Sequence, residues 1–107
     1  PIDDKVSEEY LASDQETINI VRKTYISEFE NASFLIADLL NKLDYEKILE
    51  LVHRIKGVSL YIGSKPLYDI SSYICDCIRK NITCDNEINI ICKLNSVILN
   101  ALKERIS

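Results

Sequence analysis

The sequence predicts an all-α protein: an antiparallel up-down four-helix bundle with an additional N-terminal helical segment. Its 107 residues include two glycines and two prolines, and a fold rich in strands would need more turn residues than that. Apolar residues recur every three or four positions over long stretches, which is the helical period. The connections between these stretches are short, so successive helices should run antiparallel. A chain of this length, 47% apolar, should form one domain with one core.

The N-terminal part is expected to contain a lead-in segment and two helical blocks. Residues 1–12 are interpreted as a linker or a short lead-in helix, and residues 13–107 as the bundle domain. Ser13 and Glu16 form a capping box, which predicts a helix start at this point. Helical spacing follows, weakens over residues 31–33, where we expect a kink or break, and then resumes to about Lys42. The apolar positions are Ile18, Val21, Tyr25, Ile26 and Phe29 before the break, and Phe34, Leu35, Leu39, Leu40 and Leu43 after it.

The next helix is expected to begin at Asp44 and to end at Gly63. Asp44 is a good N-cap residue, and glycine is common just after a helix end, where a left-handed backbone conformation is often required. His53 lies one position away from the core-facing stripe of this helix, so we expect it at the edge of the stripe or on the solvent side. The stripe consists of Ile48, Val52, Ile55, Ser59 and Ile62.

Two further helices complete the predicted bundle. Ser64 should cap the first, with Pro66 in its first turn, where a missing N–H is harmless. The pattern breaks over residues 81–84, and Thr83 or Asp85 should cap the second. The inward residues are Leu67, Ile70, Ile74, Cys77 and Ile78, then Ile88, Ile91, Cys92, Asn95, Ile98, Leu99, Leu102 and Ile106. The polar Asn95 should be paired there, or should lie near the end of the bundle.

Charge and hydropathy narrow the choice of partners. The formal net charge is −4 and no basic stripe occurs, which argues against nucleic acid as a partner. No apolar run approaches the ~18–20 residues of a membrane span, so we expect no membrane insertion of this domain. The acidic N-terminus does not resemble a signal peptide. Because the chain begins with Pro1 and contains no methionine, we expect it to be a fragment of a longer polypeptide.

The four cysteines do not have the spacing of a metal site. Cys75 and Cys77 lie two positions apart, roughly 200° around a helix, and so cannot share an ion there. No CxxC pair occurs, and the one histidine is distant in sequence. We therefore expect Cys75, Cys77, Cys84 and Cys92 to be small buried apolar residues in a reducing compartment.

The helix around His53 carries the most distinctive chemistry. Three- and four-residue spacings bring His53, Lys56 and Gly57 onto one face. A neutral imidazole is a nucleophile that needs no base, and a lysine one turn away could follow the oxygens of an attached phosphoryl group. Glycine inside a helix costs about 0.5–1 kcal/mol relative to alanine, so its place here suggests access for something bulky. Glu50, one turn before, could accept the other ring N–H.

This pattern alone does not decide the function, because a single histidine beside a helical stripe is most often a surface residue. No Ser-His-Asp arrangement and no glycine-rich phosphate loop can be assembled from the sequence.

The stretch His53-Arg54-Ile55-Lys56-Gly57, with Gly63 six residues after Gly57 and a helix beginning near Leu67, resembles the histidine-containing phosphotransfer (HPt) domains of multistep phosphorelays. The resemblance spans residues 18–106. It implies a four-helix bundle in which His53 accepts a phosphoryl group from an aspartyl phosphate on a receiver domain and passes it to another receiver. Lys56 would be the cation beside the phosphate, and Gly57 would leave room for the phosphoryl group and the partner.

The resemblance also implies the setting of such a domain. It would be a cytoplasmic monomer without a cofactor or nucleotide site of its own, and the Mg²⁺ used in transfer would belong to the receiver. It could be the cytoplasmic C-terminal domain of a hybrid sensor kinase. The residues expected to contact the partner are Leu49, Glu50, Leu60 and Gly63. One departure is Val58, where the family commonly has a smaller residue, which could alter docking.

Two other hypotheses remain open at this point. The first is a helical adaptor that binds a receiver or another protein without phosphotransfer, and that would not need His53. The second is an enzyme or metal-binding bundle that uses the cysteines.

Overall fold

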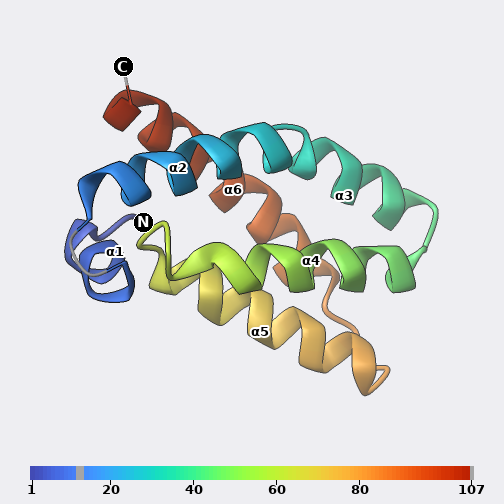
Figure 1. Cartoon of the computed structure of the whole chain (residues 1–107). Helices are drawn as coiled ribbons and strands as arrows, with labels where there is room; N and C mark the ends of the chain where they lie inside the picture. The colour runs from blue at the N-terminus through green and yellow to red at the C-terminus, as the bar shows by residue number, and fades with distance from the viewer. Residues whose placement is uncertain (12–13, 107) are drawn as a thin grey trace.

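All regular structure in the described part of the chain is α-helical, as the sequence predicts. The computed structural model describes residues 1–11 and 14–106. Its helices are α1 (Asp4–Tyr10), α2 (Gln15–Phe29), α3 (Ala32–Asn41), α4 (Tyr45–Ser59), α5 (Lys65–Arg79) and α6 (Asp85–Ile106) (Figure 1). None of the helices in these two ranges has both the length and the apolar character needed to cross a membrane.

The helices enclose one apolar core. The chain reverses direction after α3, α4 and α5, while α2 and α3 follow one another along the same side (Figure 1). Helix α4 packs against α3 and α5, and α6 packs against α2, α3 and α5. The radius of gyration of 13.7 Å is close to the ~13 Å of a compact 100-residue domain.

The predictions for α4 and the turn after it are confirmed. The Asp44 carboxylate accepts a hydrogen bond from the backbone N–H of Lys47 at 3.2 Å. All five residues of the predicted stripe are buried, and His53 is exposed. Gly63 has φ +84°, and the Ser64 hydroxyl accepts from the N–H of Leu67 at 3.2 Å. Helix α4 therefore begins at its predicted cap. Its last helical residue is Ser59, and the chain turns through residues 60–63, where the N–H of Ser64 donates to the carbonyl of Ser59 at 2.9 Å and Gly63 has the positive φ expected just after a helix end.

The prediction for α3 is only partly right. The chain does break where expected, since α2 ends at Phe29 and α3 begins at Ala32. However, Phe34 is 76% exposed, and Leu35 and Leu43 are exposed as well; the buried side chains of α3 are Ala32 and Ile36. The prediction restarts the apolar pattern at Phe34, whereas the register of α2 carries over into α3. The buried positions of the two helices keep one spacing of four, three, four, three and four residues across the break: Ile18, Arg22, Tyr25, Phe29, Ala32 and Ile36.

The expected caps of α2 and α6 also differ from the structure. Ser13 lies outside the described residues, and Asp14 caps α2 by accepting from the N–H groups of Glu16 and Thr17. Helix α6 begins at Asp85, so Asp85 lies inside the helix, and Cys84 separates Thr83 from it. Neither residue directly precedes the helix, as a cap residue would. The Asp85 carboxylate accepts instead from the Tyr45 hydroxyl at 2.9 Å, which links α6 to α4.

The N-terminal segment is helical and packs against the rest of the molecule. The N–H of Asp3 donates to the carbonyl of Gly63 at 2.7 Å. The Asp4 carboxylate pairs with Arg22 of α2 at 3.1 Å and with Arg105 of α6 at 3.0 Å. These contacts fix α1 beside the α4–α5 turn. The predicted boundary between residues 12 and 13 lies outside the described residues.

The two glycines of the chain provide a matched pair for a stability test. At Gly63, a Cβ atom would meet the carbonyl oxygen of Asp3 and, at 2.7 Å, the hydroxyl of Ser7, in a left-handed conformation that costs other residues about 1–2 kcal/mol. At Gly57, it would meet nothing within 4 Å. We expect Gly63→Ala to lower the free energy of unfolding by at least about 1–2 kcal/mol, and Gly57→Ala to raise it by about 0.5–1 kcal/mol. Urea unfolding measures both, and shifts of the same sign would contradict the prediction.

Candidate functional site

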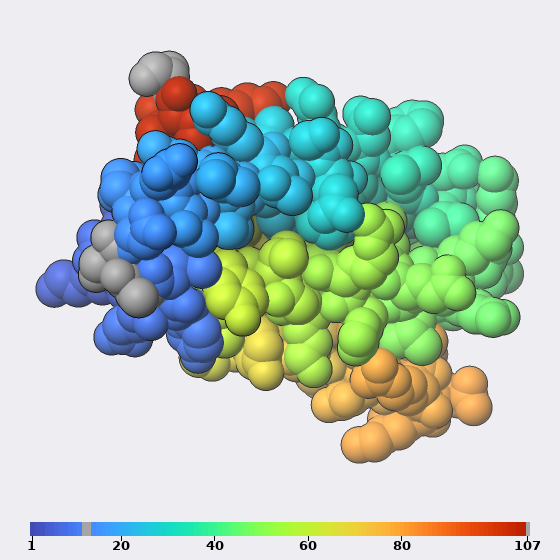
Figure 2. Space-filling view, viewed as in Figure 1, coloured from blue at the N-terminus to red at the C-terminus, as the bar shows by residue number. Residues whose placement is uncertain are grey.

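His53 lies midway along α4, on a side that no other helix covers. Its neighbour Val52 is fully buried, whereas the imidazole is exposed. Figure 2 shows α4 as a band between α2–α3 and α5. No described residue forms a hydrogen bond or an ion pair with the ring. Both ring nitrogens are therefore without a protein hydrogen-bond partner among the described residues.

Two hollows meet at His53. The first has a volume of about 240 Å³ and is lined by Tyr10, His53, Lys56, Gly57, Leu60, Tyr61 and Tyr68. The second is lined by Leu49, Glu50, His53, Arg54 and Arg79. The first is several times larger than the ~30 Å³ share of one water molecule, so a phosphoryl-sized group has room beside the ring.

The residues one turn after His53 lie where the sequence places them. The Lys56 ammonium is 5.7 Å from the centre of the Tyr68 ring, and no carboxylate of the described chain pairs with it. Gly57 is exposed and has open space where a Cβ would be. No packing within residues 1–11 and 14–106 requires a glycine at position 57. The stability that a helical glycine costs therefore points to a requirement outside these residues.

Arg79 is a site residue that the sequence analysis missed. It lies in the last turn of α5 and lines the second hollow with His53. It has no carboxylate partner in residues 1–11 and 14–106. Burial raises the pKa of the Cys75 thiol, and the positive charges of Arg79 and Lys56 oppose this rise. The net charge of the chain is −4, yet Lys56 and Arg79, which pair with no carboxylate of the described residues, both lie beside its one histidine.

Arg54 adds a third cation, but one that is already engaged. Its guanidinium pairs with Glu28 of α2 at 2.8 Å and lies 5.4 Å from the centre of the Phe29 ring. Arg54 therefore ties α4 to α2, and it is less available to a ligand than Lys56 or Arg79.

The predicted partner-contact residues divide into two groups. Leu49, Glu50 and Leu60 line the hollows beside His53, although Glu50 forms no hydrogen bond with the ring. Gly63 does not belong to this surface, because it is buried beneath the N-terminal segment and its backbone holds Asp3. The role we expected for Gly63 in partner binding is therefore corrected to a role in the α4–α5 turn.

The cysteines form a separate feature of the core. All four are free thiols, and Cys75, Cys77 and Cys84 are buried. Burial raises the pKa of Cys84 to about 11, and it raises the pKa of Cys92 as well. These two thiols therefore stay protonated, and poorly nucleophilic, near neutral pH. Within residues 1–11 and 14–106, no three side chains of His, Cys, Asp or Glu are grouped so that they could hold a metal ion.

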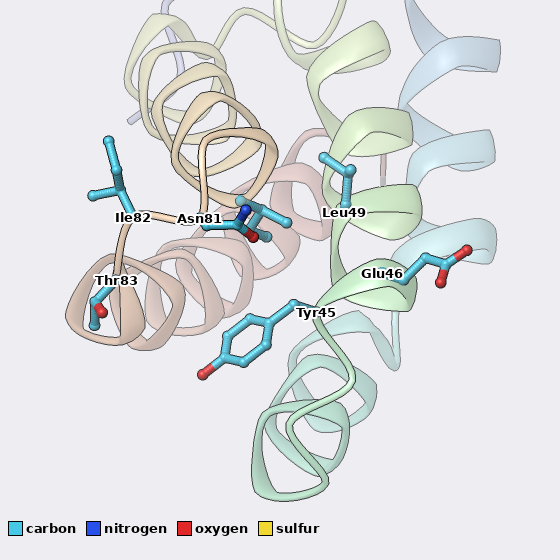
Figure 3. A pocket seen from close by; sticks show the side chains of 7 residues that line it. Tyr45, Glu46, Leu49, Asn81, Ile82 and Thr83 are labelled. Carbon is cyan, nitrogen blue, oxygen red and sulfur yellow. The ribbon is translucent and has the colours of Figure 1, made fainter.

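A further hollow of about 430 Å³ lies at the other end of α4 (Figure 3). It is lined by Tyr45, Glu46 and Leu49 of α4, by Ile78 of α5, and by Asn81, Ile82 and Thr83 of the α5–α6 connection. In Figure 3 the Tyr45 ring extends toward this connection, whereas the Glu46 side chain points away from it. Leu49 lines both this hollow and the second hollow beside His53. The site around His53 is thus bordered, toward the N-terminal end of α4, by a hollow with both apolar and polar lining residues.

Comparison with known proteins gave no match to a family model, to a curated protein or to a solved structure. The chemistry of the site therefore rests on its own geometry. An imidazole with a free lone pair, two unpaired cations and open space can accept an electrophile that carries negative charge. A phosphoryl group has these properties.

Proposed function

We propose that the chain is a phosphorelay intermediate: His53 accepts a phosphoryl group from an aspartyl phosphate on a receiver domain and passes it to the aspartate of another receiver. The observation that carries this proposal is the position of the imidazole. It is exposed and unengaged on α4, between Lys56 and Arg79, with open space over Gly57. The sequence around it resembles HPt domains, which have a histidine, a lysine and a glycine at this spacing.

The chemical step needs few protein groups. The unprotonated ring nitrogen attacks the phosphorus with its lone pair, so that an N–P bond forms while the P–O bond to the receiver's carboxylate breaks. The carboxylate leaves with the electron pair of that bond, and the other ring nitrogen keeps its proton. Onward transfer is the reverse reaction with a second receiver. Catalysis of such transfers is mostly positioning and charge stabilisation, and Lys56 and Arg79 would provide the charge. Mg²⁺ would come with the receiver.

The fold that we infer for this function is an antiparallel four-helix bundle. Helices α2 and α3 together would form its first arm, and α4, α5 and α6 the other three, with α1 outside. The reversals after α3, α4 and α5 support this arrangement (Figure 1).

The direct test is transfer of a labelled phosphoryl group from phosphorylated receiver domains to the purified chain. We expect a label that is labile in acid and stable in base, as a phosphoramidate bond is. If a panel of receivers from the source organism gives no label, the adaptor hypothesis replaces this one.

Replacing Gly57 with a larger residue should slow the transfer without unfolding the chain. The side chain of Gly57→Leu would fill the open space beside His53 and hold the donor away. A misplacement of about 1 Å can cost 100-fold in rate, so we expect a loss of about that size in the transfer rate. The matched control is Asn100→Leu, which adds the same side chain to an exposed position of α6, a helix that lines neither hollow beside His53. Equal rates for the two variants would contradict the proposed approach over Gly57.

A further inference from the structure

The N-terminal helix α1 contributes a wall of the His53 site. Tyr10, the last residue of α1, lines the first hollow together with His53, Lys56 and Gly57. Its ring meets Tyr61 edge to face, with the ring centres 5.9 Å apart and the planes at 75°. In Figure 2, α1 lies directly against the C-terminal end of α4 on the same face of the molecule.

The position of α1 depends on contacts at its opposite end. Two arginines from separate helices, Arg22 of α2 and Arg105 of α6, reach the same oxygen of Asp4. Arg22 is only 6% exposed, and a buried guanidinium holds a carboxylate partner in a defined place. The backbone bond from Asp3 to Gly63 sets the same end against the α4–α5 turn. We refer to Asp4, Arg22 and Arg105 as the arginine clasp.

We propose that α1 is part of the surface that binds the phosphorylated receiver domain, and that the arginine clasp positions it there, so that Asp4 acts on the site through Tyr10. This inference rests on the proposed function. A specific interface covers roughly 800 Å² on each partner, far more than the hollow around the ring, so a receiver that reaches His53 must also contact its walls. Aromatic residues are enriched at such interfaces, and Tyr10 and Tyr61 are 51% and 41% exposed.

The geometry favours a contact surface over a lid. His53 and Gly57 are both exposed while α1 is in place, so α1 borders the site and does not cover it. Release of α1 should therefore weaken receiver binding and should not raise the transfer rate.

The test compares Asp4→Ala and Tyr10→Ala with wild type and with Glu9→Ala, which removes one negative charge from the same helix at an exposed position. The transfer rate is measured against the concentration of phosphorylated receiver. Chemical labelling by phosphoramidate, a small donor that needs no docking surface, is measured in parallel. For both variants we expect the half-saturating receiver concentration to rise about five- to thirtyfold, the range for an aromatic interface anchor. The maximal transfer rate, the phosphoramidate labelling and the Glu9→Ala control should not change.

Asp4→Glu keeps a carboxylate for Arg22 and Arg105 and should therefore recover part of the lost affinity. Tyr10→Ala leaves the clasp intact and so tests the surface even if Asp4→Ala folds poorly. An unchanged receiver dependence in Tyr10→Ala, or faster transfer in Asp4→Ala, overturns the inference while the proposed function stands. Absence of label on wild type from any receiver overturns both.

Discussion

His53→Gln should accept no phosphoryl group from any receiver that labels the wild-type chain. Glutamine is similar in size but has an amide nitrogen whose lone pair is delocalised, so it offers no nucleophile. The ring of His53 lies off the core stripe and forms no hydrogen bond or ion pair with a described residue. Helicity should therefore stay unchanged, and the free energy of unfolding should change by less than about 0.5 kcal/mol. The measurement is acid-labile label on the purified chain, with circular dichroism of the same samples.

The matched control for this experiment is Glu46→Gln, which places the same side chain at an exposed position two turns earlier on α4. It should be labelled like wild type. Label on both His53→Gln and wild type would mean that a different residue accepts the phosphoryl group, and would falsify the assignment of His53. A wild-type chain that binds receivers without being labelled would identify an adaptor.

Those parts of the fold that depend on local chemistry could be predicted from the sequence. The start of α4 at Asp44 and the turn at Gly63 and Ser64 need only a capping side chain and a residue that tolerates positive φ. The stripe of α4 is regular, so its buried face follows from spacing alone. The face of α3 follows the same spacing, since counting on from Phe29 by three and then four residues leads to its buried Ala32 and Ile36. The prediction missed this face because it followed the larger apolar residues after the break, of which Phe34 lies in solvent.

In the candidate site, local spacing predicts some of the residues and not others. His53, Lys56 and Gly57 lie within about one turn of a single helix, so the sequence places them together. Arg79 and Tyr10 are brought to His53 by the packing of α5 and α1 beside α4, which no local spacing reports. Gly63 has the right spacing for the motif, but its neighbour in space is Asp3, sixty residues earlier in the chain.

Replacement of Asn95 should strongly destabilise the fold. It is fully buried on the inward stripe of α6, where the sequence alone left its role open. Its amide oxygen accepts from the Tyr25 hydroxyl at 2.5 Å, and its amide nitrogen donates to the carbonyl of Phe29 at 3.2 Å. Phe29 is the last residue of α2, so this bond satisfies a carbonyl left free where the helix breaks. Asn95 therefore makes the break between α2 and α3 compatible with a buried environment.

Asn95→Ala should leave two buried polar groups without partners, the hydroxyl of Tyr25 and the carbonyl of Phe29. Each costs about 1–3 kcal/mol, so we expect the free energy of unfolding to fall by at least about 2 kcal/mol and the melting temperature by roughly 8 °C or more. Burial raises the pKa of Tyr25, so its hydroxyl stays protonated and remains a donor at neutral pH. Ionisation of Tyr25 therefore cannot compensate for the lost hydrogen bond.

Asn100→Ala makes the same change at an exposed position on the same helix and should shift stability by less than about 0.5 kcal/mol. Tyr25→Phe in the Asn95→Ala background removes the stranded hydroxyl. It should restore part of the loss, whereas in wild type it removes a hydrogen bond and should destabilise. The effect of Tyr25→Phe on the free energy of unfolding should thus reverse its sign between the two backgrounds, as expected for two buried side chains that bond to each other. If Tyr25→Phe has the same effect in both backgrounds, the hydrogen bond between Tyr25 and Asn95 is not what stabilises the junction of α2, α3 and α6.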